Sequence, residues 1–404
     1  MTAPGRPLAA LAHRDFRVLL GSTMALQIGS WVQAIGMGWL VLHDLGGSAT
    51  SLGIVALVRG ASLVLLSPVG GYLADRLERR RQLVIYTSTS ATIAAILAIL
   101  ITTDSITLWM VYLAATGAGL VEALAGPIRM SLVYHSVAGE DLTNAVALNA
   151  LGGNAMRVIG PAIGGALIGT VGTQGAFQLQ AVCLALSAFL TWRLAPNTPE
   201  HMEDRPGLFR SVAGGLRYVV RDRRMLVIVA MALIPSIIVY PYVTFLPVFA
   251  RDVLHSDQSA YGYLAAAVGV GSLAGGAAVA VFAGRGKTGQ FMVWTCLAYS
   301  AAIGAFALSQ NLLLSIGILA IAGVFHSIYS ALNSSLMQLK ADEAYRGQVM
   351  SLQTMMWGTT PFAALMMGRM IDNWGAQHVV GAWMAVAVVI TLVVALFSNE
   401  LRKV

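Results

Sequence analysis

Apolar stretches of similar length recur along the whole chain, with short polar connections between them. An α-helix needs about 20 residues to cross the hydrocarbon layer of a bilayer, which is about 30 Å thick. Twelve stretches close to this length lie near residues 17–43, 49–74, 82–103, 107–133, 143–170, 174–195, 225–250, 258–283, 289–310, 312–338, 346–371 and 376–398. The pattern therefore predicts an all-α integral membrane protein with twelve transmembrane helices.

A polar segment, 196–222, divides the predicted spans into two sets of six. It contains several prolines and charges of both signs, which favour a connection outside the bilayer. Its later part, 208–220, is compatible with a short helix on the membrane surface. We expect an N-terminal six-span bundle over 1–195, a cytoplasmic linker over 196–222, and a C-terminal six-span bundle over 223–404.

The two halves repeat one another at matching positions. Pairs separated by a steady offset within each span are Gly53 and Gly262, Gly60 and Gly269, Gly119 and Gly323, Glu122 and His326, and Pro161 and Pro361. Internal repeats of this kind are a feature of many membrane transporters. They predict a parallel duplication that gives two pseudo-symmetric six-helix bundles.

Composition and charge agree with a membrane location. Hydrophobic residues make up 57% of the chain and charged residues only 11%, which excludes an ordinary soluble globular protein. The net charge of +7 does not indicate nucleic-acid binding, because the basic residues are scattered over short loops between spans. Most lie on the side of the 71–81 loop, and Arg251 is the only one in a loop on the opposite side. This positive-inside distribution predicts a multi-pass protein of the cytoplasmic (plasma) membrane with both termini in the cytoplasm.

The sequence gives no sign of enzymatic chemistry. Cys183 and Cys296 lie within apolar spans, where we expect them to pack as small hydrophobic residues. No metal-ligand cluster, nucleophile–base arrangement or nucleotide-hydrolysing domain is recognisable. We therefore expect no cofactor, no bound metal and no ATP-driven step.

The loop between the second and third spans has a distinctive spacing of charges. Its sequence, GYLADRLERRR, matches the major facilitator superfamily signature G-x-x-x-D-R-x-G-R-R at Gly71, Asp75, Arg76, Arg79 and Arg80. Glu78 stands where the signature has glycine. The chain thus resembles this superfamily, and the resemblance implies a gate in which Asp75 meets the N-terminus of the eleventh span, near Arg346. The alternative is a loop whose arginines only fix the topology.

The fifth span carries a second pattern, with Gly160, Pro161, Gly164 and Gly165 in the string GPAIGG. It resembles the GPxxGG core of the antiporter motif of the superfamily, although Met156 replaces an upstream glycine. With Gly126-Pro127-Ile128-Arg129 at the inner end of the fourth span and with Asn144-Ala145, the string is similar to that of the branch of enterobactin and macrolide exporters. The alternative is ordinary packing of small residues between helices.

Few ionisable groups lie within the predicted spans. A charge at the bilayer centre costs roughly 2.5–3.5 kcal/mol, so such groups usually face the bundle interior and pair with one another. Glu122 is the only carboxylate expected deep within a span, and Arg59 and Arg157 should lie at a similar depth. We predict that Glu122 is the proton-coupling residue and that the two arginines oppose its charge. Recognition of a cationic substrate and a purely structural ion pair are the alternatives.

In the superfamily, the first, fourth, seventh and tenth spans line a central cavity. The resemblance therefore implies a substrate cavity whose candidate residues are Gln27, Trp31, Tyr240, Phe325, His326 and Tyr329. These side chains would suit a bulky, amphipathic or aromatic ligand.

These observations together predict a secondary transporter that works by alternating access. The resemblance makes it a proton-driven exporter of a lipophilic drug or a siderophore-like small molecule. A proton-coupled nutrient importer and a non-transporting membrane sensor or scaffold are the alternatives. The expected partners are a small-molecule substrate, protons and the lipid bilayer, with no nucleic acid, and we expect a monomer.

Overall fold

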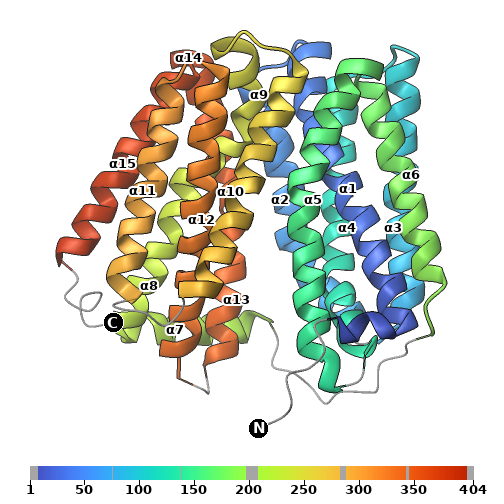
Figure 1. Ribbon diagram of the computed structural model, residues 1–404, viewed down its shortest axis with the longest axis horizontal. Coiled ribbons are helices and arrows are strands. Elements are labelled where there is room, and N and C mark those ends of the chain that lie inside the picture. The colour runs from blue at the N-terminus through green and yellow to red at the C-terminus, as the bar shows by residue number, and fades with distance from the viewer. Residues whose placement is uncertain are drawn as a thin grey trace. The chain divides into compact units, whose positions relative to one another are not determined.

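The computed structural model of the protein describes residues 8–74, 76–137, 139–196, 208–282, 288–342 and 345–397. Every regular element in these ranges is helical (Figure 1). The α-helices are α1 (Arg14–Trp39), α2 (Ala49–Ala74), α3 (Arg79–Thr102), α4 (Leu108–His135), α5 (Leu142–Val171), α6 (Thr173–Trp192), α7 (Leu208–Arg221), α8 (Arg223–Leu233), α9 (Leu246–Val248), α10 (Gln258–Phe282), α11 (Thr288–Leu308), α12 (Leu312–Lys340), α13 (Arg346–Trp357), α14 (Thr360–Trp374) and α15 (Ala376–Phe397).

Ten helical stretches within the described ranges are long and apolar enough to cross a membrane. Large apolar side chains on them, such as Leu113 and Leu313, are exposed, as expected of helices that face lipid. The predicted all-α membrane architecture is therefore confirmed. The predicted spans 143–170 and 346–371 are not among the ten, although α5 covers the first of them as one continuous helix. The count of twelve stays a prediction.

The predicted eleventh span is not one continuous helix. A break at Gly358 and Thr359 separates α13 from α14, and Pro361 lies in the first turn of α14. Proline has no backbone N–H and its ring crowds the preceding turn, so it is tolerated at the start of a helix and breaks one elsewhere. The predicted span near 346–371 is therefore made of two helices, α13 and α14.

The seventh span is helical but irregular. Between α8 and residue Val253 the backbone passes through wider and tighter helical turns, Ile234–Val239 and Tyr240–Phe245, before the short α9 and a further wide turn. Pro235, Pro241 and Pro247 recur at six-residue intervals along this stretch. Each removes one backbone hydrogen bond, which explains why a regular α-helix cannot run through it.

The contacts of the chain divide it into two compact units. Unit 1 contains Met1–Leu45 and Val58–Asp204, and unit 2 contains Gly46–Leu57 and Arg205–Val404. The division at Asp204 falls within the predicted linker 196–222. The first turns of α2, however, group with unit 2, so this helix belongs partly to each unit.

A carboxylate of unit 2 caps the start of α2. Asp372 on α14 accepts hydrogen bonds from the backbone N–H of Ala49 (2.8 Å) and of Thr50 (2.9 Å). A negative side chain at a helix N-terminus satisfies free N–H groups and complements the helix dipole. On the same helices, a methyl group added at Gly53 would lie 2.7 Å from Leu365 Cα, and one added at Gly368 would lie 2.5 Å from Ala49 O. The start of α2 is therefore packed closely against α14.

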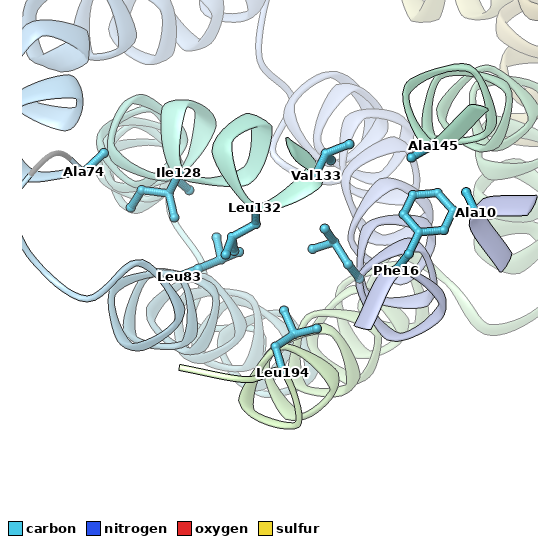
Figure 2. Packing of buried hydrophobic residues seen from close by; sticks show 11 residues of the cluster. Ala10, Phe16, Ala74, Leu83, Ile128, Leu132, Val133, Ala145 and Leu194 are labelled. Atoms are coloured by element: carbon cyan, nitrogen blue, oxygen red, sulfur yellow. The ribbon is translucent and has the colours of Figure 1, made fainter. Parts of the chain in front are cut away.

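An apolar cluster closes one end of unit 1, beside the 71–81 loop. Figure 2 shows side chains from α1, α3, α4 and α5 converging there. Phe16, Leu83, Ile128 and Leu132 are at most 5% exposed. Buried groups of this size each contribute about 1.5–3 kcal/mol relative to exposure in water. The cluster therefore fixes the helices of unit 1 at the end where the loop returns.

The same glycine packing occurs within each unit. A methyl group added at Gly119 on α4 would lie 2.3 Å from the backbone oxygen of Arg59 on α2, and one added at Gly323 on α12 would lie 2.4 Å from that of Val268 on α10. Arg59 and Val268 directly precede Gly60 and Gly269, a pair that the sequence repeat aligns. In both units, a glycine thus allows two helix backbones to touch at equivalent points.

We expect Gly119→Ala to destabilise the protein by about 1–3 kcal/mol, because the new methyl group forces α2 away from α4. Gly126→Ala on the same helix is the matched control, since a methyl group there meets no atom within 4 Å. Thermal unfolding of the purified variants measures the difference. Equal melting temperatures for the two variants would contradict this account of the contact.

Candidate functional site

A polar cavity of about 550 Å³ lies inside unit 1. Helices α1, α3, α4, α5 and α6 line it, together with Arg59 of α2. Its polar and charged lining residues are Thr23, Gln27, Ser30, Gln33, Arg59, Thr87, Ser90, Glu122, Arg129, Asn149 and Gln180. A chamber of this size and polarity is large enough for a small molecule.

Arg59 and Glu122 form an ion pair on the cavity wall. Arg59 Nη2 donates to Glu122 Oε2 at 2.9 Å, and Arg59 Nε donates to the same oxygen at 3.2 Å. The contact of Gly119 with the Arg59 backbone, one turn from Glu122, places the two side chains together. The side chains are 37% and 49% exposed, so the pair contributes only about 0–1 kcal/mol to stability. It is therefore a pair that can open at little cost.

Arg157, the other predicted opposing charge, makes a different contact. Its guanidinium carbon lies 5.7 Å from the centre of the Trp31 ring, in a cation–π arrangement. The structure thus brings Arg59 to Glu122 and brings Arg157 to Trp31.

Arg129 is a cavity residue that the sequence reasoning did not select. It lies seven residues after Glu122 on α4, which is two helical turns or about 10.5 Å along the same face. No salt bridge of Arg129 occurs within 4.0 Å among the described residues. The seven-residue spacing from Glu122 is the signal in the sequence that could have identified it.

Several buried polar atoms on the cavity wall have no hydrogen-bond partner in the described part of the chain. They are Thr23 Oγ1, Thr87 Oγ1, Asn149 Oδ1 and Gln180 Oε1. A buried polar group without a partner costs about 1–3 kcal/mol. Such groups are rare in native structures and each requires an explanation. Here the residues that carry these atoms all line the cavity.

The antiporter-like string of α5 packs directly against the cavity helix α1. All four of its residues, Gly160, Pro161, Gly164 and Gly165, are buried. A methyl group added at Gly160 would lie 2.4 Å from Trp31 Cβ, and one at Gly164 would lie 3.2 Å from Ile35 Cβ. The string therefore sets the position of Trp31 in the cavity wall, and the close small-residue packing is part of how it does so.

The arginines of the predicted gating loop are anchored within unit 1. Arg79 is 8% exposed; its Nε donates to Ala74 O at 3.3 Å and its Nη1 lies 3.4 Å from His135 Nε2. Arg80 donates to Glu78 Oε1 and to Leu194 O, both at 3.1 Å. These contacts hold the loop to the ends of α2, α4 and α6.

The remaining motif residues are less informative. Gly71 lies in the last turns of α2. Arg76 stacks on the ring of Tyr72, 4.3 Å from its centre. Asp75 lies outside the described residues.

The candidates in the second half gather around a much smaller space in unit 2. His326 lies between the rings of Tyr240 and Tyr299, at centroid distances of 5.5 and 5.2 Å. His326 and Tyr329 line a cavity of about 20 Å³, which has room for about one water molecule. Phe325 is half-buried on α12 and lines neither cavity. Of the predicted substrate residues, only Gln27 and Trp31 therefore border the large cavity.

The many apolar spans, the internal polar cavity and the ion pair on its wall are typical of a small-molecule transporter of the membrane. Over residues 5–403 the chain matches the family described as transmembrane secretion effector. It belongs to this family of the major facilitator superfamily, as its motifs predicted. It is a multi-pass membrane transporter of small molecules and not an enzyme.

Several relatives have named transport activities. The chain is 24% identical over 390 residues to the staphyloferrin A transporter of Staphylococcus aureus, covering 96% of this chain and 97% of that protein. It is 24% identical over 402 residues to the multidrug efflux pump Tap of Mycolicibacterium fortuitum, covering 96% of each chain. It is also 25% identical over 311 residues to the enterobactin exporter EntS of Shigella flexneri, covering 76% of this chain and 73% of that one.

Solved structures of transporters share the fold. The nucleoside transporter NupG aligns with a TM-score of 0.75 at 15% identity, over 95% of this chain and 98% of that one. A POT family transporter aligns with a TM-score of 0.76 at 13% identity, over 96% and 97% of the chains. The predicted major facilitator fold is confirmed.

We expect Gly160→Ala to reduce transport strongly and to destabilise the protein by about 1–3 kcal/mol, because the methyl group displaces Trp31 from the cavity wall. Gly152→Ala on the same helix is the control, since its methyl group would meet only flexible side chains, Leu20 at 3.4 Å and Met24 at 3.7 Å. Transport by the two variants at equal membrane abundance is the measurement. An equal loss of transport in both variants would show that any added methyl group on α5 impairs the protein, whether or not it contacts Trp31.

Proposed function

We propose that the protein is a proton-driven exporter that moves a siderophore-like or drug-like small molecule out of the cytoplasm by alternating access. The observation that carries the proposal is the Arg59–Glu122 ion pair on the wall of the unit 1 cavity. The exporters among the relatives support the direction of transport. We also propose that the chain acts as a monomer in the cytoplasmic membrane with both termini in the cytoplasm.

Glu122 is the residue that carries the proton in this proposal. When ionised, it accepts two hydrogen bonds from Arg59. Protonation removes its negative charge and releases Arg59, so the two protonation states differ in the contact between α2 and α4. Because the pair is partly exposed, the contact itself can open at small free-energy cost. A transporter that couples a proton to a conformational change needs such a pair of states.

The 71–81 loop acts as the gate in this proposal. Arg79 and Arg80 anchor the loop within unit 1. The resemblance to the superfamily signature implies that Asp75 meets the N-terminus of the eleventh span, near Arg346. A carboxylate at a helix N-terminus gains about 0.3–1 kcal/mol from the dipole. That amount can bias a population of conformations without locking it.

We expect Glu122→Gln to abolish the gradient-dependent part of efflux, because glutamine keeps the shape and hydrogen bonding of the side chain but cannot titrate. Energy-independent exchange of substrate should survive. The measurement is accumulation of a panel of siderophores and drugs in a pump-deficient bacterial host, before and after the proton gradient is collapsed. Glu140→Gln is the matched control, since Glu140 lies in the connection between α4 and α5, off the cavity.

Two results would count against this assignment. Unchanged efflux with unchanged dependence on the gradient would make Glu122 structural. Weakened binding of cationic compounds, with neutral compounds still pumped, would instead make Glu122 a recognition residue.

The proposed topology has its own test. Reporters fused after Leu45, Asp104 and Ser256 should report the outside of the cell, and those after Arg80, Glu203 and Arg285 the cytoplasm, because short arginine-rich loops stay on the cytoplasmic side. An alkaline phosphatase and green fluorescent protein pair of fusions measures each site. If any one of these fusions reported the opposite side of the membrane, the proposed topology would be wrong.

A further inference from the structure

The cavity of unit 1 carries an excess of positive charge. Three guanidinium groups, those of Arg59, Arg129 and Arg157, lie on it or against its wall, and Glu122 is the single carboxylate on its lining. Other acidic residues described in unit 1 lie off the cavity: Asp44 accepts from Thr173, and Asp141 pairs with His13. Placing uncompensated charges within a membrane span is costly, so an excess of one sign marks a functional site.

Of these positive charges, that of Arg129 lies on the cavity lining and is available to a ligand. Arg59 is already paired with Glu122 through two hydrogen bonds. Arg129 has no salt bridge within the described ranges, and Arg157 contacts the face of the Trp31 ring. The planar guanidinium fork matches a carboxylate better than any other ligand group except phosphate.

Neutral hydrogen-bonding groups surround these charges. Thr23, Thr87 and Gln180 line the cavity and are at most 6% exposed, and each has a buried polar side-chain atom with no partner in the described part of unit 1. They come from α1, α3 and α6, so they converge from different sides. A purely lipophilic ligand would leave all of them unsatisfied, at a cost for each. Hydroxyl, carboxylate or amide groups on the ligand would satisfy them.

We propose that the substrate of this cavity is a hydrophilic organic anion, bound through a carboxylate group to Arg129 and through its other polar groups to Thr23, Thr87 and Gln180. This inference rests on the proposed transport function and narrows its substrate class from drug-like or siderophore-like molecules to carboxylate-bearing ones. Organic cations are rejected, because two guanidinium groups repel them and the one carboxylate is already paired.

The test uses the full-length protein in lipid nanodiscs and measures equilibrium binding of radiolabelled citrate, a compact tricarboxylate with a hydroxyl group. Competition with unlabelled citrate, with its neutral triethyl ester and with tetraethylammonium tests the role of charge. Citrate alone should displace the label. No saturable citrate binding at millimolar concentrations, or equal displacement by the neutral ester or the cation, would overturn the proposal.

Variants place the binding in the cavity. Arg129→Gln should weaken citrate binding about tenfold or more, since it removes a charge-assisted hydrogen-bonding partner. Arg129→Lys keeps the charge but loses the planar fork, so it should weaken citrate binding less than Arg129→Gln. This conservative variant also tests the site if Arg129→Gln fails to fold. Arg369→Gln is the matched control, because Arg369 is an exposed span arginine in unit 2. Equal binding by all variants would place citrate elsewhere and overturn the site.

These outcomes separate the substrate class from the coupling. If citrate binds at Arg129 but efflux ignores the proton gradient, the anion site stands and the proton-driven mechanism fails. If Glu122→Gln abolishes gradient-driven efflux while citrate does not bind, the mechanism stands and the anion site fails.

Discussion

The close contact between the α2 and α4 backbones is the constraint on which the unit 1 site depends. Gly119 allows the carbonyl of Arg59 to approach to a distance that no side chain would permit. This contact brings Arg59 within hydrogen-bond reach of Glu122, one turn further along α4. A second close approach, Gly160 against Trp31, sets the opposite wall. Because glycine has no side chain at these positions, the helices approach each other closely. This close approach positions the charged and aromatic groups that surround the polar cavity.

The two units share this backbone packing but not its chemistry. Where unit 1 has Arg59 and Glu122 beside the glycine contact, unit 2 has Val268 and His326. In unit 2 aromatic rings fill the space around His326 and leave about 20 Å³, against about 550 Å³ in unit 1. A duplicated fold has therefore kept its helix contacts, while charged residues lie beside the glycine contact in one copy only.

Sequence reasoning predicted part of the site for identifiable reasons. Glu122 and Arg59 were found because charges within apolar spans are few, and helix rise alone gives their depth. Arg129 was not selected as a site residue because it lies at the inner end of the fourth span, away from the middle layer that Glu122 and Arg59 reach. Only the packing of α4 among its neighbours shows that it faces the same cavity as Glu122. His326 and Tyr329 were predicted from a family pattern, yet the space that they line depends on how neighbouring aromatic rings fill it.

The sequence by itself determined the helical membrane architecture, the family and the loop and span motifs, because each follows from local composition and spacing. Hydrocarbon thickness sets helix length, and the lack of water in the bilayer leaves helices as the way to satisfy the backbone of such apolar spans. The tertiary structure decided which charges pair and which remain free. It also decided that α2 is shared between the units and that the eleventh span is broken before Pro361. These features depend on contacts between residues far apart in the chain or on the packing of a single turn. The hydrophobic periodicity of one segment contains information on neither of these.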